Sequence, residues 1–344
     1  MKKILIICAG RTAYNITRVL KETINDFLIC GYYDFMNNNP YNFKMVKYTH
    51  LLKFDGQFLI ASNMKNTVNS VETELINLGI DKSKILKIDE LNLNIKLDLK
   101  ALSFLKKNIQ LNAELFEKIV RAKFNNDFDT VADMNLFLKC EEEYKEFSMI
   151  KNGDVIIDCG TFDGSTAFDM LKEANWNNEN TKVYSFDASL KFLKEQHKHE
   201  KISFIEKALF YQTCKVNFHE YPGIEAPGSF TTELNHNKSS SKNIVQATSI
   251  DDFCRKNKIS RVNYIKMDVE GSEPEVLKGA LKTIDKYKPR MAVSIYHKLE
   301  HHWELPMYVL EKFPFYKMAF SHYSNYFDGS IMYFSPEDFK IASN

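Results

Sequence analysis

The sequence predicts an α/β protein made of two doubly wound units with a helical connector between them. Short apolar segments alternate with helical patterns over residues 1–93 and again over 151–344, whereas residues 94–150 show helical spacing alone. Two apolar segments, at 154–158 and 263–267, run directly into acids and a glycine. Because ligands of open α/β sheets bind at the carboxyl ends of the strands, these acids predict a ligand site in the second unit.

Composition and charge exclude several classes of protein. The chain has 344 residues, too many for one typical core, and its 44% hydrophobic and 26% charged residues are ordinary for a globular protein. The net charge of +1, from 46 basic and 45 acidic residues without a basic cluster, argues against nucleic-acid binding. No segment is long and apolar enough to span a membrane. The six cysteines form no CxxC pair, which is typical of a reduced, cytoplasmic protein.

Residues 1–93 predict a small parallel sheet. Strands are expected at 3–8, 27–33, 58–61 and 85–88, and helices at 12–21 and 67–78. The first apolar run ends at Gly10, too early for a signal peptide, so it favours a strand. Gly79 is expected to end the second helix. In the connector at 94–150, apolar residues from Leu99 to Ile119 recur at helical spacing and predict helices packed between the units.

Residues 151–344 predict a larger, mostly parallel sheet. Strands are expected at 154–158, 183–186, 202–206, 263–267 and 290–296, with helices at 165–172, 189–197, 249–256, 274–280 and 303–312. A strand at 215–219 is expected to extend the sheet edge, and 315–322 with 331–334 should form a C-terminal antiparallel hairpin. The longest predicted loop, at 221–242, is a candidate lid.

The turn after the strand at 154–158 carries the chemistry of a cofactor site. Gly160 would allow a ligand to approach the backbone closely, but its spacing to Gly164 differs from that of dinucleotide-binding turns. Asp158 at the strand end does not suit a pyrophosphate, so we expect a nucleoside without phosphates that carries a cation. S-adenosylmethionine meets this description. Asp187 ends the next strand and could accept hydrogen bonds from both ribose hydroxyls. A NAD-linked dehydrogenase is a weaker alternative.

These motifs together resemble the FkbM family of S-adenosylmethionine-dependent methyltransferases. The resemblance covers about 144–335, and its matching segments are 158–164, 184–187, 250–252, 265–273, 276–280, 288–290, 294–298 and 321–324. It implies a Rossmann-like class I methyltransferase domain at 151–344 and methyl transfer, usually to oxygen, in polysaccharide or natural-product biosynthesis. Asp187-Ala188 departs from the Glu-Pro that the family more often has. Residues 1–93 resemble the small Rossmann-like domain attached to many glycan-modifying enzymes, which leaves ligand binding or a scaffold role open.

The resemblance and the strand-end acids together give a set of candidate site residues. His297 is the first candidate for the general base and His322 the second, with Asp268 beside them. In a metal-binding alternative, Asp268, Glu270 and His297 offer two oxygens and one nitrogen to magnesium or manganese. The residues expected to bind the cofactor are Asp158, Gly160, Thr161, Asp163, Gly164, Ser165, Asp187, Ala208, Asp268 and Glu270.

The predicted function is O-methylation of a hydroxyl on a sugar or glycan precursor of capsule, lipopolysaccharide or natural-product type. The acceptor class follows from the resemblance alone. Two alternatives remain open: a methyltransferase that acts on a protein or nucleic-acid nitrogen, and a nucleotide-sugar-binding assembly protein without catalysis. The sequence does not define the acceptor, and it leaves open whether the chain forms a homo-oligomer.

Overall fold

The structure of the chain is a computed structural model that divides into two units. It describes residues 2–8, 27–35, 44–62, 65–87, 97–125, 127–134, 136–219, 229–230 and 243–339. Unit 1 comprises Met1–Leu97, Asn125–Phe128 and Tyr221–Ile224, and unit 2 comprises Asp98–Phe124, Asp129–Glu220 and Glu225–Asn344. The predicted helix at 12–21, Gly10 and most of the predicted loop at 221–242 lie outside the described residues.

Unit 1 contains a parallel sheet in the order β2-β1-β3-β4. Its described elements are β1 (Lys2–Ile7), β2 (Phe27–Tyr33), α2 (Tyr48–Leu51), β3 (Gln57–Ile60), α3 (Lys65–Asn77), η1 (Lys82–Lys84) and β4 (Ile85–Lys87). The four predicted strands and the helix at 67–78 are confirmed. Leu75 of α3 packs into the same core as Leu5 and Phe58, which explains the apolar face of that helix. Gly79 follows α3 with φ +81°, as expected of a glycine that ends a helix.

The segment predicted as connector helices contains helices and one short strand, and residues 98–124 belong to unit 2. Its elements are α4 (Leu99–Asn108), β5 (Ile109–Leu111), α5 (Ala113–Phe124), α6 (Phe128–Ala132) and η3 (Leu136–Glu142). The helical interpretation of residues 109–111 was wrong, because this segment pairs with the C-terminal hairpin as a parallel edge strand. Asn112 has φ +65° and donates a side-chain hydrogen bond to Phe320 O at 2.8 Å, which fixes the break between the two helices.

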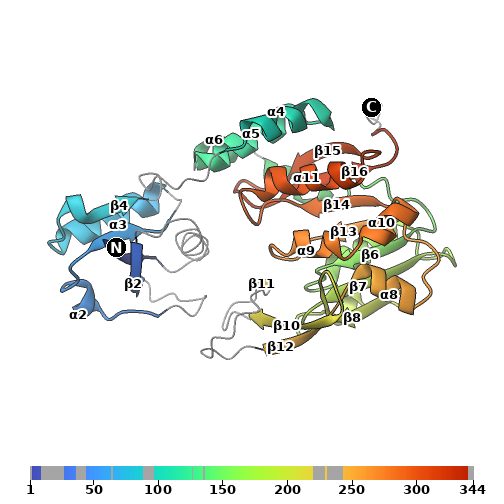
Figure 1. The fold of residues 1–344 in the computed structure, drawn as a ribbon, viewed down its shortest axis with the longest axis horizontal. Coiled ribbons are helices and arrows are strands. Elements are labelled where there is room, and N and C mark those ends of the chain that lie inside the picture. The colour runs from blue at the N-terminus through green and yellow to red at the C-terminus, as the bar shows by residue number, and fades with distance from the viewer. Residues whose placement is uncertain are drawn as a thin grey trace. The chain divides into compact units, whose positions relative to one another are not determined.

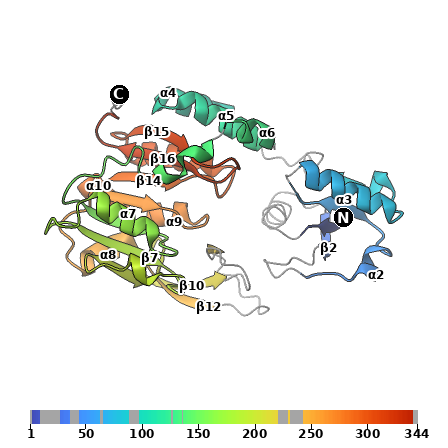
Figure 2. The ribbon, with the colours of Figure 1, turned by 180° about the vertical axis from the view of Figure 1, so that it is seen from behind.

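Unit 2 is built on an eight-stranded sheet in the order β5-β15-β16-β14-β13-β6-β7-β8 (Figure 1). Its further strands are β6 (Val155–Cys159), β7 (Lys182–Asp187), β8 (Ile202–Glu206), β13 (Tyr264–Met267), β14 (Arg290–Ser294), β15 (Lys317–His322) and β16 (Ser330–Ser335). Only β16 runs antiparallel to its neighbours, which confirms the predicted C-terminal hairpin. The helices of the unit are α7 (Ser165–Glu173), α8 (Ile250–Lys256), α9 (Glu273–Lys278), α10 (Leu281–Tyr287) and α11 (His301–Lys312). Figure 1 shows α4, α5 and α11 beside the β15–β16 end of this sheet, and Figure 2 shows α4 and α5 there from behind.

Two predictions for unit 2 were wrong. The segment at 215–219 does not extend the main sheet, because it lies in a separate sheet with the order β11-β10-β12-β9. The strands of that sheet are β9 (Ala208–Leu209), β10 (Cys214–His219), β11 (Ser229–Phe230) and β12 (Asn243–Thr248). The helix expected at 189–197 is reduced to the single turn η4 (Glu195–His197). The segment is held by another contact, since Lys194 N donates a hydrogen bond to Asp163 O and the side-chain nitrogen Nδ1 of His197 lies 2.9 Å from the same oxygen.

None of the helices in the described ranges is both long and apolar enough to cross a lipid bilayer.

Candidate active site

The predicted acids meet where the strand order of the main sheet reverses. From β6 the chain proceeds to β7 and β8 on one side, and later returns to β13 and β14 on the other. Asp158 is in β6, Asp187 ends β7, and Asp268 follows β13. In open α/β sheets, ligands bind outside the carboxyl ends of the strands at such a switch point. The topology therefore places the site at the edge that the sequence predicted.

Gly160 is required by the approach of two strand ends. It has φ +90°, and a Cβ there would lie 1.8 Å from the backbone oxygen of Asp268. No side chain fits at that distance, so the residue lets the turn after β6 lie directly against the end of β13. Gly164 has φ +86° and precedes α7, and a Cβ there would lie 2.7 Å from Leu193 Cδ1. Both predicted glycines thus shape the turn, and Gly160 does so through a contact within the protein.

Asp158 is fully buried and faces protein groups. Its Oδ1 lies 3.2 Å from Lys266 Nζ in a buried ion pair, and its Oδ2 accepts a hydrogen bond from Ser185 Oγ. Lys266 Nζ also donates to Gly160 O, so one ammonium group ties β13 to the turn after β6. The opposite charge outweighs burial and raises the pKa of Lys266. Sequence reasoning did not give Lys266 a role, although a lysine inside an apolar strand is a usable signal of a buried ion pair.

Two further carboxylates hold the turn between Gly160 and Gly164. Asp187 accepts hydrogen bonds from Phe162 N at 2.9 Å and Ser189 N at 3.1 Å. Burial raises the pKa of Asp187 against the effect of these bonds. Asp163 accepts from Ser165 N at 2.9 Å and pairs with Lys194 at 3.0 Å. Burial works to raise the pKa of Asp163, but these partners outweigh it and lower the pKa to about 2.

Thr161 and Ala208 complete the account of the predicted cofactor residues. Thr161 is buried, and its Oγ1 has no hydrogen-bond partner among the described residues. Such an orphaned hydroxyl marks a place where a ligand can supply the missing partner. Ala208 is buried in β9, where it packs with Ala188 and Phe218.

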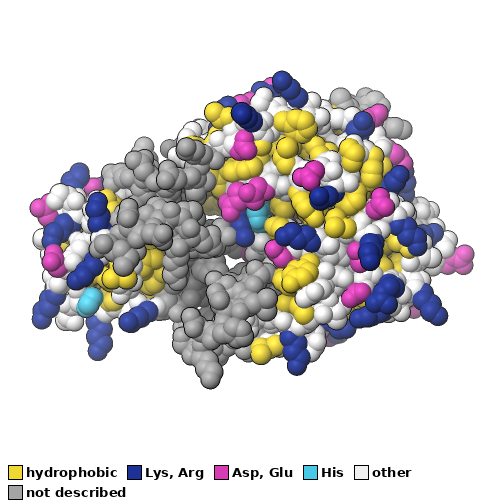
Figure 3. Space-filling view, in the orientation of Figure 1, with side chains coloured by type: hydrophobic (Ala, Val, Ile, Leu, Met, Phe, Trp, Pro, Cys, Tyr) yellow, Lys and Arg dark blue, Asp and Glu magenta, His cyan; other side chains and the backbone are white. Residues whose placement is uncertain are grey.

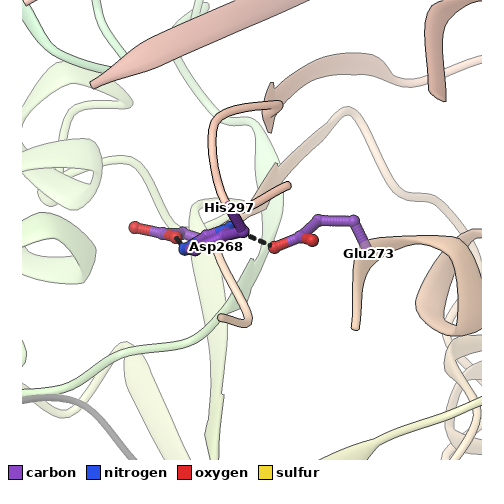
Figure 4. Close-up of side chains that lie close together, drawn as sticks. All are labelled: Asp268, Glu273 and His297. Atoms are coloured by element: carbon purple, nitrogen blue, oxygen red, sulfur yellow. Dashed lines mark ion pairs between the residues drawn. The ribbon is translucent and has the colours of Figure 1, made fainter. Parts of the chain in front are cut away.

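His297 lies between carboxylates at the carboxyl ends of β13 and β14 (Figure 4). His297 Nδ1 lies 2.9 Å from Glu273 Oε1, and Nε2 lies 3.3 Å from Asp268 Oδ1 and 3.6 Å from Glu270 Oε2. The structure thus brings Asp268, Glu270 and His297 together as predicted. Glu273 was missed as a member of this cluster, although it stands in the motif that carries the resemblance. Figure 3 shows acidic side chains gathered beside a histidine on the visible face of unit 2.

Glu273 is the buried support of this cluster. It is fully buried, accepts hydrogen bonds from Val269 N at 3.1 Å and Gly271 N at 3.2 Å, and lies 3.3 Å from His301 Nδ1. Burial lowers the pKa of His297, but Glu273 and the other carboxylates outweigh it and raise the pKa to about 9. Among the described residues, carboxylates face both ring nitrogens and favour the protonated ring. A proton must leave Nε2 before the ring can act as a base or bind a cation, so the role of His297 as general base stays a prediction.

Three more groups lie near Asp268, and the sequence predicted a place beside that carboxylate for none of them. Tyr144 OH donates to Asp268 Oδ2 at 2.7 Å, and Tyr296 OH lies 3.3 Å from Asp268 Oδ1. Glu143 precedes Tyr144, and burial followed by the charge of Asp268 raises its pKa to about 7. The acidic residues 141–143 lie in the segment that the sequence predicted as the helical connector. Nothing in the local sequence indicates that this segment returns to the carboxyl end of β13.

His322, the second predicted base, is a structural residue. Its Nδ1 lies 2.7 Å from Ser330 Oγ and its Nε2 lies 2.8 Å from Tyr326 O, so the β15–β16 hairpin engages both ring nitrogens. The side chain is fully buried, and burial lowers its pKa to about 4. A neutral imidazole with both nitrogens engaged is not available for proton transfer.

The lowered pKa of His322 predicts acid sensitivity. The unfolded chain binds a proton near pH 6.5 and the folded chain near pH 4, so stability from this group is present above pH 6.5 and is lost as the pH falls toward 4. Between pH 7 and pH 5 the group should cost about 2 kcal/mol of unfolding free energy. From pH 7 to pH 5, the unfolding free energy of His322→Gln, measured with urea, should fall by that much less than the unfolding free energy of the wild type. The unfolding free energy of His199→Gln should fall by as much as that of the wild type. Equal losses in all three proteins would contradict the assignment.

Comparison with known proteins agrees with the class that the fold and site define, a Rossmann-like methyltransferase. Residues 158–328 match the model of the methyltransferase FkbM domain. The crystal structure of methyltransferase FkbM from Methylobacillus flagellatus KT is similar over 97% of this chain and 90% of that chain, with 15% identity and a TM-score of 0.53. Residues 158–328 of the chain therefore form a methyltransferase FkbM domain.

A SAM dependent methyltransferase from Aquifex aeolicus aligns over 60% of this chain and 96% of its own, with 14% identity and a TM-score of 0.31. No curated protein matches the sequence.

Proposed function

We propose that this methyltransferase uses S-adenosylmethionine to methylate a hydroxyl group of a sugar or glycan precursor. The observation that carries the proposal is the placement of the Gly160–Gly164 turn, Asp187 and the Asp268 cluster at one switch point of the sheet. When bound, S-adenosylmethionine supplies an electrophilic methyl group whose transfer to oxygen breaks its bond to sulfur and releases the hydroxyl proton. The protein must position the acceptor and remove that proton.

The donor set at the turn fits this cofactor. Thr161 Oγ1 lacks a hydrogen-bond partner among the described residues, and the carboxylates of Asp163 and Asp187 hold the turn. A carboxylate has about four lone-pair sites, and Asp187 uses two of them for Phe162 N and Ser189 N. The remaining sites can accept the ribose hydroxyls. Asp187 therefore both shapes the turn and binds the ligand in this proposal.

Asp187→Ala is expected to weaken the affinity for S-adenosylhomocysteine by at least about tenfold, because each lost hydrogen bond to a charged group is worth roughly 1.5–3 kcal/mol. Asp187→Asn keeps one acceptor oxygen and should lose less. The control is Asp169→Ala, which removes an exposed carboxylate of α7 that pairs only with Lys172 at the surface. Calorimetry gives all the affinities. If Asp187→Ala bound as tightly as Asp169→Ala, Asp187 would not be a ribose ligand.

Proton removal is assigned to Glu143. Its pKa of about 7 lets it ionise and accept a proton at neutral pH, and it lies within electrostatic reach of Asp268. Tyr144, the residue after Glu143, and Tyr296 both donate hydrogen bonds to Asp268. In this proposal the acceptor hydroxyl is held beside Asp268 and transfers its proton to Glu143.

Glu143→Gln is expected to lower turnover by roughly 10²-fold, the usual contribution of a general base, without weakening cofactor binding. Glu141→Gln is the matched control, because Glu141 is an exposed residue two positions earlier. The measurement is release of S-adenosylhomocysteine with a methylated acceptor. Parallel loss of turnover and cofactor affinity would show that Glu143 supports the fold instead.

The acceptor class is tested with S-adenosylmethionine that carries a deuterated methyl group. Nucleotide-sugars and capsule-type oligosaccharides are offered beside peptides and nucleic acids, and mass spectrometry locates the label. We expect the label on a sugar oxygen. Label on a peptide or base nitrogen would replace the proposed acceptor with a nitrogen substrate.

A further inference from the structure

The geometry points to a divalent-cation site formed by Asp268, Glu270 and His297, with Glu273 orienting the histidine. The inference rests on the proposed function only in that the cation would stand at the same switch point and orient the acceptor hydroxyl. It concerns an ion of the magnesium or manganese class, because hard oxygen ligands with one imidazole suit these metals.

The first argument is distance. His297 Nε2 lies 3.3 Å from Asp268 Oδ1 and 3.6 Å from Glu270 Oε2. Adjacent ligands of an octahedral ion with bonds of about 2.1 Å stand roughly 3 Å apart. Both distances from Nε2 are close to this spacing, so small side-chain movements would direct the imidazole and the two carboxylates at one ion. One ligand atom each of Asp268, Glu273 and His297 also lie within 4.8 Å of one another.

The second argument is the state of the histidine. The side chain of His297 is only 5% exposed, and its Nε2 makes no hydrogen bond of good geometry with a described residue. A buried imidazole aimed at carboxylates without such a bond requires a further partner. A cation at Nε2 provides one and also balances the surrounding carboxylates. Lys266, the nearby buried cation, is already paired with Asp158 at 3.2 Å.

The third argument is the support behind the ring. Glu273 Oε1 lies 2.9 Å from His297 Nδ1, on the side of the ring opposite Asp268 (Figure 4). Metal-binding histidines usually direct their second nitrogen to such a carboxylate, which fixes the tautomer with Nε2 free for the ion. Glu273 is held in turn by the backbone N–H groups of Val269 and Gly271. We therefore assign Glu273 as a positioning residue and the other three as ligands.

The site also gives a reason for the left-handed backbone conformation of Glu270. Glu270 has φ +55°, a conformation that costs a residue with a Cβ roughly 1–2 kcal/mol. This conformation, followed by Gly271 at φ +99°, turns the chain so that Glu270 Oε2 faces His297. An ion bound at this place would offset the strain.

The test is a titration with Mn²⁺ of the whole chain, treated first with a chelator and kept in the presence of S-adenosylhomocysteine. Binding is measured by calorimetry and by the spin-resonance signal of free Mn²⁺. We expect one ion per chain. Asp268→Asn and His297→Gln should each lower the affinity at least about tenfold, and Glu273→Gln by roughly 10–100-fold. Glu275→Gln, which changes a carboxylate of the same helix α9 that pairs with Lys278, should bind Mn²⁺ as the wild type does.

Binding of S-adenosylhomocysteine is measured in every variant and separates the two proposals. Absence of saturable Mn²⁺ binding in wild-type protein that binds S-adenosylhomocysteine would overturn the cation site and leave the proposed function standing. Equal Mn²⁺ affinity in Asp268→Asn, His297→Gln and Glu275→Gln would also overturn it, since the ion would then be bound elsewhere. Mn²⁺ binding that depends on Asp268 and His297 without S-adenosylhomocysteine binding would support the cation site and sink the cofactor assignment.

Discussion

Gly160→Ala is expected to prevent unit 2 from reaching its native structure. The added methyl group would meet the backbone oxygen of Asp268 at 1.8 Å, and neither atom belongs to a flexible side chain. The left-handed φ of +90° adds its own penalty. Strain and overpacking together should cost on the order of 3–6 kcal/mol, which is comparable to the whole stability of a typical domain.

A matched glycine separates the clash from the backbone penalty. Gly153 lies in the same unit at φ +85°, and a Cβ there would meet only the amide of Asn178, at 3.2 Å. Gly153→Ala should cost roughly 1–2 kcal/mol, the usual price of a Cβ in the left-handed region. Urea unfolding and circular dichroism compare the two proteins. Similar midpoints for both variants would show that the turn after β6 does not lie against β13 as described.

Lys266→Met is expected to destabilise unit 2 by about 3–5 kcal/mol. The substitution keeps the length of the side chain but leaves the carboxylate of Asp158 buried without its counter-charge. It also removes the hydrogen bond to Gly160 O that ties β13 to the cofactor turn. We therefore expect S-adenosylhomocysteine affinity to fall together with stability.

The double variant Asp158→Asn with Lys266→Met tests the cause of that loss. Removing both charges should recover a large part of the stability, because the uncompensated charge is the main penalty. Lys278→Met, at an exposed lysine of α9, should stay within about 0.5 kcal/mol of the wild type. A double variant as unstable as Lys266→Met would mean that lost packing, rather than a buried charge, is responsible.

The sequence predicted the positions of most strands in the two parallel sheets because buried parallel strands are continuous apolar runs. Residues 27–33 and 202–206 became β2 and β8 with the predicted bounds. Short edge strands gave no such signal. Ile109–Leu111 follows Leu105 at helical spacing, and its pairing with β15 depends on residues more than two hundred positions away. The helix predicted at 189–197 is reduced to a turn because bonds to Asp163 O hold this segment. Those bonds come from a distant part of the chain and leave no local signal.

The site was predicted where the ends of neighbouring strands define it. Asp268, Glu270 and His297 do come together, because β13 and β14 are neighbours in the parallel sheet. The roles of the residues needed the structure. His297 faces acids at both nitrogens, and Glu273 supports it from the first turn of α9. Tyr144 reaches Asp268 from the segment between β5 and β6, a contact that no local pattern indicates.

A calorimetric titration of the full chain with S-adenosylhomocysteine tests the central claim most directly. We predict saturable one-to-one binding in the micromolar range that is weakened by Asp187→Ala and unaffected by Asp169→Ala. This result would establish the turn between Gly160 and Gly164 as the cofactor site. Absence of binding by folded protein would contradict the proposed use of S-adenosylmethionine and direct attention to nucleotide-sugar binding without catalysis.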